Sequence, residues 1–582
     1  MTVACWGLAV ATAQGVAVGP AFLLERGAAS VTPRRIERDE VAAEVERLEA
    51  ALQAAQRALK AVRDQIPATT PINVAEFIDS HLLMLQDVAL IDPARTLIRE
   101  QLLSADWALQ QHREELLKVF ETMEDPYLRS RRDDVDHVVH HVLTFLLAGV
   151  SEEPAVEEDI RGSVVIARDI SPADTIVLHQ RGAAAFVTES GGPTSHTAIL
   201  ARSLNIPAVM GVHNVTRYCR HGETVVVDGE TGTVLADVST GIFEHYRRRV
   251  RNLTARRNRL LHLVGEPAVS TDGIAVTLLA NLELPEDTKL ARANGAAGVG
   301  LYRTEFLYMN RDGLPTEEEH LAAYLEVLRG FVGSPVTIRT LDLGVDKQVE
   351  GAGSPCPTVC NPALGLRAIR LCLREPDLFR PQLRAILRAS AQGPVRMMIP
   401  MLSSVQELDS VLALVEQTRR ELAREGLPFD PQMPVGGMIE VPAAALSAAA
   451  FSRRLDFLSI GTNDLIQYTL AIDRTDDAVN YLFDPLNPAI LRLIRGTIEA
   501  GIAQGKPVSM CGEMAGDPRY TRLLLGLGLR EFSMQPSALL EVKEIVRGSD
   551  IGSLKTLSAE LFQRIDEEEP ERLLEALNRR GD

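Results

Sequence analysis

Cysteine is scarce in this sequence, with 6 among 582 residues. So low a frequency argues against a disulfide framework and favours a reducing, cytoplasmic compartment. Two of the six, Cys356 and Cys360, form a CPTVC pair. Since no second pair of cysteines or histidines lies nearby to complete a tetrahedral site, we do not expect a structural zinc ion there.

Excess positive charge and long uninterrupted apolar runs are also lacking. Lys and Arg number 61 against 79 for Asp and Glu, which gives a formal net charge of −18. Nucleic acid is thereby excluded as a main partner, because its binding needs a basic surface, whereas a basic protein partner would suit the acidic balance. The apolar segment 1–27 has no basic start, and glycines and Gln14 interrupt it. We therefore expect no membrane insertion.

The remaining composition is that of an ordinary globular protein, with 46% hydrophobic and 24% charged residues. A chain of this length is expected to form about two to four domains. Segment 1–27 reads as short strands, 28–149 carries amphipathic helical patterns such as VAAEVERLEAALQAAQRALKAVRDQI, and 150–238 returns to strands. We therefore predict a swivelling α/β domain formed by 1–27 and 150–238, with a helical bundle, 28–149, inserted into it.

The second half of the sequence alternates apolar runs with helical patterns. Segment 239–266 is a charged helical linker whose basic run reads as a solvated face. Segment 267–582 then contains eight candidate strands: TLLANLE, GVGLYRTEF, VTIRTLDLG, VRMMIPM, VGGMIEV, FLSIGTNDL, PVSMCGEM and EFSM. That count and length predict a (β/α)8 barrel of the TIM type, so the fold class is multidomain α/β.

Polar residues gather at the C-terminal ends of these strands, where such barrels form active sites. They are Arg303, Arg339, Asp342, Glu440, Asn463, Asp464 and Cys511, with Arg474 just beyond. Arginine forks suit phosphate and carboxylate, two carboxylates supply hard oxygen ligands for Mg²⁺, and a thiol can transfer a proton. Pairing of these arginines and carboxylates with each other, and a packing role for the cysteine, stay open as the alternative.

His196 stands where a glycine-rich turn becomes a helical pattern, in SGGPTSHTAILARSLNIPAVMG. A helix that begins at Thr197 would present free N–H groups to an anion held beside the imidazole. A neutral imidazole can carry a phosphoryl group and release it again. A histidine that merely caps the helix is the alternative that the residues alone leave open.

Several motifs together resemble one family, Enzyme I of the bacterial phosphotransferase system, the phosphoenolpyruvate–protein phosphotransferases. They are GGPTSHTAILARSLNIPAVMG, GLYRTEFLYMNRDGLPTEEE, IRTLDLGVDK, NPALGLRAIR, GGMIEVPAAA, FLSIGTNDLIQYTLAIDR and MCGEMAG, in the family's order over essentially the whole chain. The resemblance implies an ATP-independent relay. The phosphoryl group of phosphoenolpyruvate moves to His196 and then to a histidine of the carrier protein HPr. Pyruvate is released, and the relay is the first step of sugar uptake.

The resemblance also assigns roles to residues by their place in these motifs. Substrate ligands would be Arg303, Arg339, Asn463, Asp464 and Arg474, with Lys347 as a supporting charge; Mg²⁺ ligands would be Glu440 and Asp464. Cys511 would be the proton donor, and Thr175 would orient His196. One departure touches the substrate loop, where Val345 replaces the family's second glycine.

Partners follow from the same resemblance. HPr would dock on the inserted helices, with His81, Met84, Leu85 and Arg131 as interface residues, and the barrel would form a homodimer. Two other interpretations compete. A dikinase or phosphoenolpyruvate synthase carries a similar histidine motif but needs a large ATP-binding domain before it. A non-catalytic regulatory paralogue would not need the intact His196, Glu440, Asp464 and Cys511.

Overall fold

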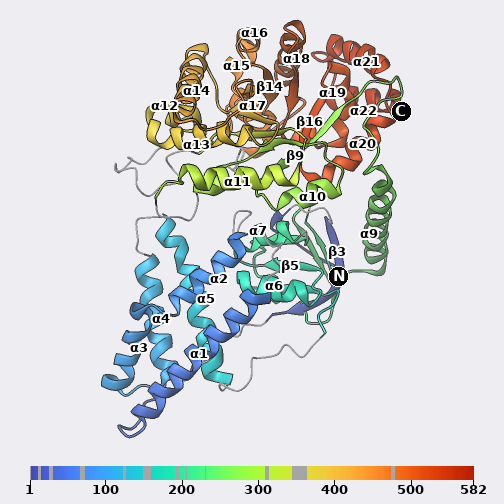
Figure 1. Cartoon of the computed structure of the whole chain (residues 1–582). Coiled ribbons are helices and arrows are strands. Elements are labelled where there is room, and N and C mark those ends of the chain that lie inside the picture. The colour runs from blue at the N-terminus through green and yellow to red at the C-terminus, as the bar shows by residue number, and fades with distance from the viewer. Residues whose placement is uncertain are drawn as a thin grey trace. The chain divides into compact units, whose positions relative to one another are not determined.

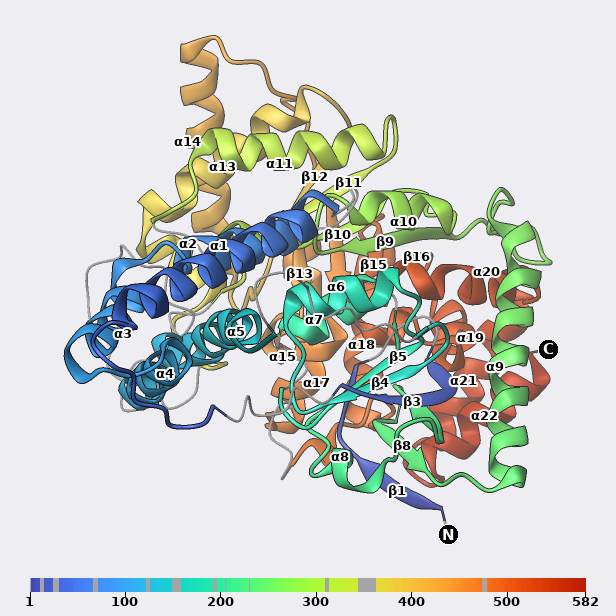
Figure 2. The same ribbon diagram turned by 90° about the horizontal axis from the view of Figure 1, so that it is seen from below.

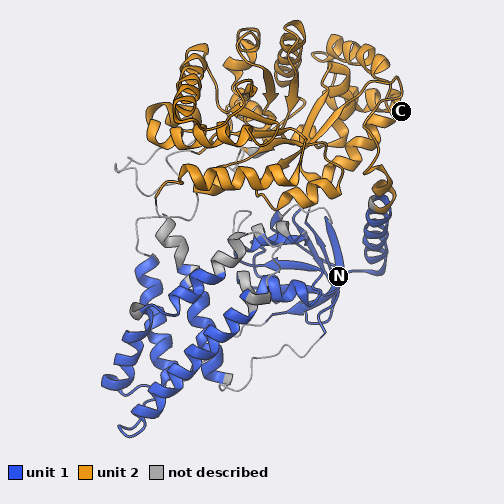
Figure 3. Cartoon of the chain, viewed as in Figure 1, with its two compact units in different colours: residues 1–257 blue, residues 258–582 orange. Residues whose placement is uncertain are grey.

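The structure is a computed structural model that describes residues 2–10, 15–24, 31–65, 72–121, 126–148, 159–191, 196–204, 206–229, 231–308, 313–343, 363–473 and 479–581. A few side chains within these ranges, including that of His196, lie outside the description. The chain divides into two compact units, residues 1–257 and residues 258–582 (Figure 3). The finer division into four domains with separate roles stays a prediction.

Unit 1, residues 1–257, contains a mixed sheet of eight strands in the order β1-β8-β7-β3-β4-β5-β6-β2. The strands are β1 Val3–Trp6, β2 Leu8–Val10, β3 Val16–Leu23, β4 Val164–Ala167, β5 Ala185–Thr188, β6 Ala208–Met210, β7 Thr224–Asp228 and β8 Thr233–Ala236. β3 pairs in parallel with β4, although the helical segment separates them in sequence. The helices are therefore an insertion into one α/β unit, as predicted. The described part of this α/β fold also contains three shorter helices: α6 Pro172–Gln180, α7 His196–Ser203 and α8 Val215–Tyr218.

The described part of the insertion contains five helices, coloured from blue to cyan in Figure 1. They are α1 Val41–Gln65, α2 Ile72–Met84, α3 Val88–Gln101, α4 Ala105–Glu121 and α5 Pro126–Ala148. Their apolar faces form one core around fully buried residues such as Leu48, Ile98 and Leu143. Ile176 of α6 and Leu200 of α7 join the same core. The bundle is thus packed against the helix that carries His196.

Helix α9, Thr240–Leu260, carries the chain out of unit 1. Arg249 forms an ion pair of 2.8 Å with Asp228, whose side chain is buried at the end of β7. This pair fixes the first part of α9 to unit 1, because an ion pair to a buried carboxylate is costly to break. The boundary between the units falls inside the helix, at Arg257 and Asn258.

Unit 2, residues 258–582, is a closed barrel of eight parallel strands, all of which the sequence predicted. They are β9 Thr277–Leu282, β10 Val299–Tyr302, β11 Val336–Arg339, β12 Val395–Ile399, β13 Val435–Ile439, β14 Phe457–Ile460, β15 Val508–Met510 and β16 Glu531–Met534. β16 pairs with β9 and closes the barrel. The fold class, a TIM-type barrel that follows an α/β unit with inserted helices, is confirmed.

Helices surround these strands in Figures 1 and 2. They are α10 Asp287–Ala293, α11 Glu317–Gly330, α12 Ala368–Arg374, α13 Pro376–Ser390, α14 Val405–Glu425, α15 Pro442–Leu446, α16 Ala448–Ser452, α17 Thr462–Leu470, α18 Pro488–Ala503, α19 Pro518–Leu527, α20 Leu539–Arg547, α21 Ile551–Arg564 and α22 Pro570–Arg580. Short 3₁₀ turns accompany them: η1 Leu261–Leu263, η2 Glu305–Tyr308, η3 Asn480–Leu482, η4 Glu513–Ala515 and η5 Pro536–Ala538. Reciprocal capping boxes start α11, at Thr316 and Glu319, and α14, at Ser404 and Glu407, and satisfy otherwise unpaired N–H groups. Among the described helices, none is long and apolar enough to cross a membrane.

Candidate active site

The polar residues predicted at the barrel rim come together in the structure. All strands of a parallel barrel end at one rim, so residues that directly follow them surround a single opening. Arg303 follows β10, Arg339 ends β11, Glu440 follows β13, Asn463 and Asp464 lie in the first turn of α17 after β14, and Cys511 follows β15. Their charges influence one another, since the pKa of Cys511 responds to Glu440, Arg339 and Arg303.

Arg339 is held between two carboxylates. Its Nη2 donates to Glu305 Oε1 at 2.9 Å and its Nη1 lies 2.8 Å from Asp342 Oδ2, with the arginine side chain 11% exposed. Burial alone would lower the pKa of the guanidinium, but the charges of Glu305 and Asp342 outweigh it and raise that pKa. Among the described residues, the buried Nε of Arg339 has no hydrogen-bond partner. The pairing alternative is thus realised for Arg339, because both of its terminal nitrogens lie against carboxylates.

Asp342 links Arg339 to a second arginine. Arg367 Nη2 donates to Asp342 Oδ1 at 3.0 Å. Burial would raise the pKa of the Asp342 carboxyl, but Arg339 and Arg367 lower it below its usual value. Arg367 also donates to the Tyr468 hydroxyl at 3.3 Å. The rim therefore contains a fixed chain of charges rather than free side chains.

Arg303 is held less firmly than Arg339, because its ion pair with Glu283 is exposed. Its Nη1 bonds to Glu283 Oε1, and the two side chains are 35% and 62% exposed. Exposed ion pairs contribute little because water and salt screen them. Arg303 can therefore exchange Glu283 for a ligand at low cost.

Glu440 is a buried carboxyl with unbalanced negative charge near it. It is 2% exposed, and its Oε1 accepts the N–H of Met401 at 2.6 Å. Burial first, then the charges of Asp464 and Asp342, raise its pKa well above the usual value, against the opposing effect of Arg339. Gly461 passes so close that a Cβ there would lie 2.8 Å from Glu440 Oε2.

Glu440 and Asp464 fit a divalent cation by their chemistry. Two neighbouring carboxylates repel each other, and a bound cation would offset both that repulsion and the burial of Glu440. Within the described ranges, no group of three or more His, Cys, Asp or Glu residues forms a complete cage. A cation here would take its other ligands from water and substrate oxygens, which is the habit of Mg²⁺.

Cys511 is a buried thiol that stays protonated at neutral pH. Burial raises its pKa to about 11, and a hydrogen bond from Ser459 Oγ at 3.3 Å opposes that effect only partly. Asn281 Nδ2 donates to the Cys511 carbonyl at 3.0 Å and fixes the backbone. A protonated thiol can serve as an acid, whereas a nucleophilic cysteine needs a lowered pKa.

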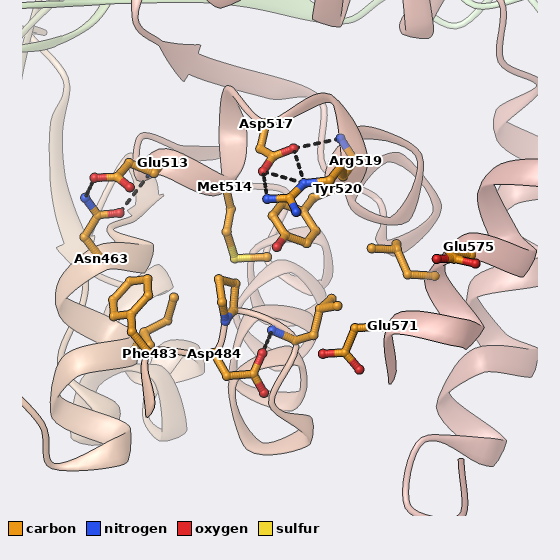
Figure 4. Close-up of a pocket in the computed structure, with 14 residues that line it drawn as sticks. Asn463, Phe483, Asp484, Glu513, Met514, Asp517, Arg519, Tyr520, Glu571 and Glu575 are labelled. Carbon is orange, nitrogen blue, oxygen red and sulfur yellow. Dashed lines mark hydrogen bonds and ion pairs between the residues drawn. The ribbon is translucent and has the colours of Figure 1, made fainter. Parts of the chain in front are cut away.

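Asn463 is oriented by the loop after β15. Its Nδ2 donates to Glu513 Oε1 at 2.9 Å, and its Oδ1 accepts the Glu513 N–H at 2.9 Å. The pair borders a cavity of about 560 Å³ that extends to α22, as Figure 4 shows. The cavity is acidic. Arg519, the one arginine among its described lining residues, is paired with Asp517, and the other lining carboxylates are Asp484, Glu513, Glu571 and Glu575. The Asn463 amide is thus already engaged at the edge of the rim.

His196 begins helix α7, one residue earlier than the expected start at Thr197. The residue therefore stands at the start of a helix, as the sequence predicts. Thr197 Oγ1 donates to the Ile170 carbonyl at 2.7 Å and ties this first turn to the segment before α6. The His196 side chain and residues 192–195 lie outside the described part.

Thr175, the predicted orienting residue, is fully buried in α6. Its hydroxyl donates to the Ser171 carbonyl at 2.9 Å. Since a hydroxyl has a single proton, Thr175 can meet an imidazole N–H only as an acceptor. Its predicted role requires that geometry.

The predicted partner-binding residues in the bundle are not all at the surface. His81 is 4% and Leu85 is 1% exposed, and Met84 packs against the helical core. The burial of His81, in α2, and of Leu85, in the turn that follows it, argues against direct contact of these side chains with a partner. Leu83, between them in sequence, is 68% exposed. The Arg131 side chain lies outside the description.

Other predicted positions also fall outside the described residues, namely Lys347, Arg474, Val345, Cys356 and Cys360. Conversely, the structure adds four residues to which sequence reasoning assigned no role: Glu305, Arg367, Ser459 and Glu513. Glu305 lies in GLYRTEF and Arg367 in NPALGLRAIR, so their charge within motifs was the available signal.

The barrel rim, with buried arginines, a carboxylate pair and a protonated thiol, defines an α/β enzyme that binds a small polyanion. Three family models match the chain. Residues 257–551 match the PEP-binding domain of PEP-utilising enzymes, residues 160–232 match their mobile domain, and residues 9–131 match their N-terminal region.

Curated relatives agree over the full length. The phosphoenolpyruvate-protein phosphotransferase of Cupriavidus necator is 46% identical over 98% of this chain and 99% of its own. The one from Priestia megaterium is 42% identical over 92% of this chain and 93% of its own. A solution structure of an Enzyme I protein, 32% identical, covers 43% of this chain and 98% of that one with a TM-score of 0.35.

The chain belongs to the family of PEP-utilising enzymes and, within it, to the phosphoenolpyruvate-protein phosphotransferases. The resemblance seen in the motifs is therefore confirmed, and so is the prediction of a transferase that uses phosphoenolpyruvate.

Proposed function

We propose that this enzyme transfers the phosphoryl group of phosphoenolpyruvate to His196 and then to a histidine of HPr, as the first step of sugar uptake. The rim carries the proposal, since it combines a protonated Cys511 with arginines that suit a substrate bearing both a phosphate and a carboxylate. An imidazole nitrogen of His196 attacks phosphorus, the bond from phosphorus to the enol oxygen breaks, and the enolate of pyruvate leaves. The Cys511 thiol then gives its proton to the methylene carbon of that enolate, which becomes pyruvate.

Arg303 and Arg339 would hold the phosphate and carboxylate groups, with Asn463, Asp464, Arg474 and Lys347 in support. The ion would be Mg²⁺, held by Glu440 and Asp464, and it would stabilise charge on the substrate oxygens. Arg339 and Arg367 together offset the charges of Glu305 and Asp342, which limits the repulsion between these carboxylates and the substrate.

The first transfer joins residues of different units, so His196 has to reach the barrel rim and then release its phosphoryl group elsewhere. We propose the linker 239–266 as the hinge and the inserted helices as the HPr docking site. Exposed residues such as Leu83 are better candidates for that contact than the buried His81 and Leu85. We also propose a cytoplasmic location, which the scarcity of cysteine and the resemblance support. The resemblance further supports a homodimer formed through the barrel.

Labelling with ³²P-phosphoenolpyruvate and Mg²⁺ tests the proposal. The protein should acquire a label that acid removes and base does not, and HPr should remove it. His196→Ala should abolish labelling, whereas His221→Ala, at an exposed position outside the linker, should not. Labelling of His196→Ala would refute the assignment of that residue, and labelling from ATP instead of phosphoenolpyruvate would favour a dikinase.

A further inference from the structure

Thr304 connects the two rim arginines through the backbone. It directly follows Arg303, and its hydroxyl donates to the carbonyl of Arg339 at 3.0 Å. The same hydroxyl oxygen accepts Gln382 Nε2 at 3.0 Å. Thr304 and Gln382 are both fully buried. The ends of β10 and β11 are therefore joined by one threonine whose donor and acceptor are both used.

Gln382 reaches the same two strand ends from helix α13. Its Oε1 accepts the N–H of Leu341 at 2.9 Å. Leu341 precedes Asp342, the carboxylate that binds the Arg339 side chain. One amide group thus fixes Thr304 on one side and the loop beyond Arg339 on the other.

The orientation of this amide follows from its partners. Reversal would place the NH₂ group against the Leu341 N–H, two donors face to face, and would leave Thr304 without its donor. Nε2 lies 3.3 Å from the Tyr324 hydroxyl, which in turn lies 3.1 Å from His320 Nδ1. Both of these residues are fully buried in α11. A buried network with its members satisfied is rigid, because no water is at hand to replace a lost partner.

The network also reaches the residue that closes η2. His320 Nε2 lies 3.2 Å from the Tyr308 hydroxyl, and η2 begins at Glu305, the second carboxylate on Arg339. The Arg339 backbone, its two carboxylates and the neighbour of Arg303 are therefore tied to helices α11 and α13. Among the described residues, Gln382 bonds to Leu341, Thr304 and Tyr324 and not to either arginine side chain.

We propose that Thr304 and Gln382 are positioning residues that set the separation of Arg303 and Arg339 and thereby the affinity for phosphoenolpyruvate. The inference rests on the proposed function, in which both guanidinium groups bind one substrate. Two forks must meet the phosphate and carboxylate of a small molecule at once, so a shift of one strand end misplaces one fork. Neither residue touches the substrate.

Thr304→Val, which keeps the shape and removes the hydroxyl, tests this role against Thr304→Ser, which keeps the hydroxyl. Thr304→Val should raise the KM for phosphoenolpyruvate by about ten-fold to a hundred-fold, the range expected for a misplaced binding group. Thr304→Ser should restore the wild-type KM. Thr497→Val is the matched control, since Thr497 is equally buried and donates to Leu493 within α18 at 2.8 Å.

Thermal unfolding of each variant distinguishes an effect on the placement of the arginines from an effect on the stability of the fold. A merely structural role would lower the Tm of Thr304→Val and of Thr497→Val alike and leave the KM of both unchanged, and that result would overturn the inference. Gln382→Met decides the question by the same KM criterion if Thr304→Val does not fold. If wild-type protein acquires no label from phosphoenolpyruvate, the proposed function fails; if it is labelled and neither variant changes the KM, only this inference fails.

Discussion

The hydroxyl of Ser459 donates a hydrogen bond to the thiol of Cys511 at 3.3 Å, from strand β14 to the residue that follows β15. The thiol in turn donates a hydrogen bond to the Ile460 carbonyl, at a distance of 3.8 Å from sulfur to oxygen. Burial dominates this environment and raises the pKa of Cys511 to about 11. The arrangement keeps a proton on sulfur at physiological pH while holding the sulfur in place, which suits an acid at the barrel rim.

Replacement of Cys511 by alanine should therefore reduce turnover without loss of substrate affinity. A positioned acid contributes about 10²-fold to 10⁴-fold to a rate, so we expect pyruvate release to slow by that factor. Pyruvate formation and equilibrium binding of phosphoenolpyruvate measure the two effects separately. Cys219→Ala, at a buried cysteine of unit 1, is the control that should leave turnover intact. Unchanged turnover in Cys511→Ala would remove the proton-donor role.

Ser459→Ala should move the titration of the same thiol upward. The Ser459 hydrogen bond lowers the pKa of Cys511, so its loss raises that pKa above about 11. Alkylation needs the thiolate. The rate of alkylation at Cys511, followed by mass spectrometry of its peptide, should rise with pH. The pH midpoint of that rise should be higher in the variant than in the wild type. A raised pKa also means that Cys511 stabilises the fold fully below about pH 9 and loses that contribution as pH rises towards 11. An unchanged midpoint would show that Ser459 does not act on the thiol.

Sequence periodicity was sufficient to locate the eight barrel strands, because strands buried on both faces are continuous apolar runs bounded by turns. Position at strand ends also gave the rim residues. It could not give their partners. Arg367 reaches Asp342 from beyond the loop that follows β11, and Ser459 reaches Cys511 through the register of neighbouring strands. The helical pattern around His81 likewise marked an amphipathic helix, but which face packs inward depends on the other helices.

Glu440→Gln should weaken divalent metal binding and abolish its pH dependence. Burial and the charge of Asp464 raise the pKa of Glu440, so its proton competes with a cation over a higher pH range than for an ordinary glutamate. Binding of Mn²⁺, measured by calorimetry in buffers of different ionisation enthalpy, should strengthen as pH rises and release a proton from the wild type. Glu531→Gln is the control, because Glu531 lies at the N-terminal end of strand β16, away from the rim. Equal Mn²⁺ affinity in wild type and Glu440→Gln would exclude Glu440 as a ligand.

Arg339→Lys should be a severe change although it preserves the charge. Lysine cannot reproduce the fork that meets Glu305 and Asp342 at 2.9 and 2.8 Å. Asp342 would keep Arg367, but the half-buried Glu305 would lose its arginine, at a cost of up to about 3–5 kcal/mol if the pair is broken outright. We expect a lower Tm and a KM for phosphoenolpyruvate raised by at least about ten-fold, with Arg384→Lys, on the outer helix α13, as a control for the KM. A wild-type KM in Arg339→Lys would show that Arg339 pairs with Glu305 and Asp342 but does not bind the substrate.

His137 connects the inserted helices to the segment that holds the start of α7. Its Nε2 lies 2.7 Å from Asp169 Oδ2, and Asp169 Oδ1 accepts the Ile170 N–H at 2.9 Å. The Ile170 carbonyl in turn accepts the hydroxyl of Thr197, the neighbour of His196. His137→Leu removes the first of these bonds, so we expect a loss of about 1–3 kcal/mol in the stability of this segment.

Hydrogen exchange resolved by peptide measures that loss. The amides of residues 169–171 and of the first turn of α7 should exchange faster in His137→Leu, while those of β7 should not change. Asp169→Asn, which keeps an acceptor for the Ile170 N–H, should show a smaller effect because only the contact to His137 is weakened. Phosphorylation from phosphoenolpyruvate should slow in the order of the exchange effects, since the pair acts on the histidine through its helix. Equal exchange in both variants and the wild type would show that the bundle does not stabilise the segment to which the start of α7 is bonded.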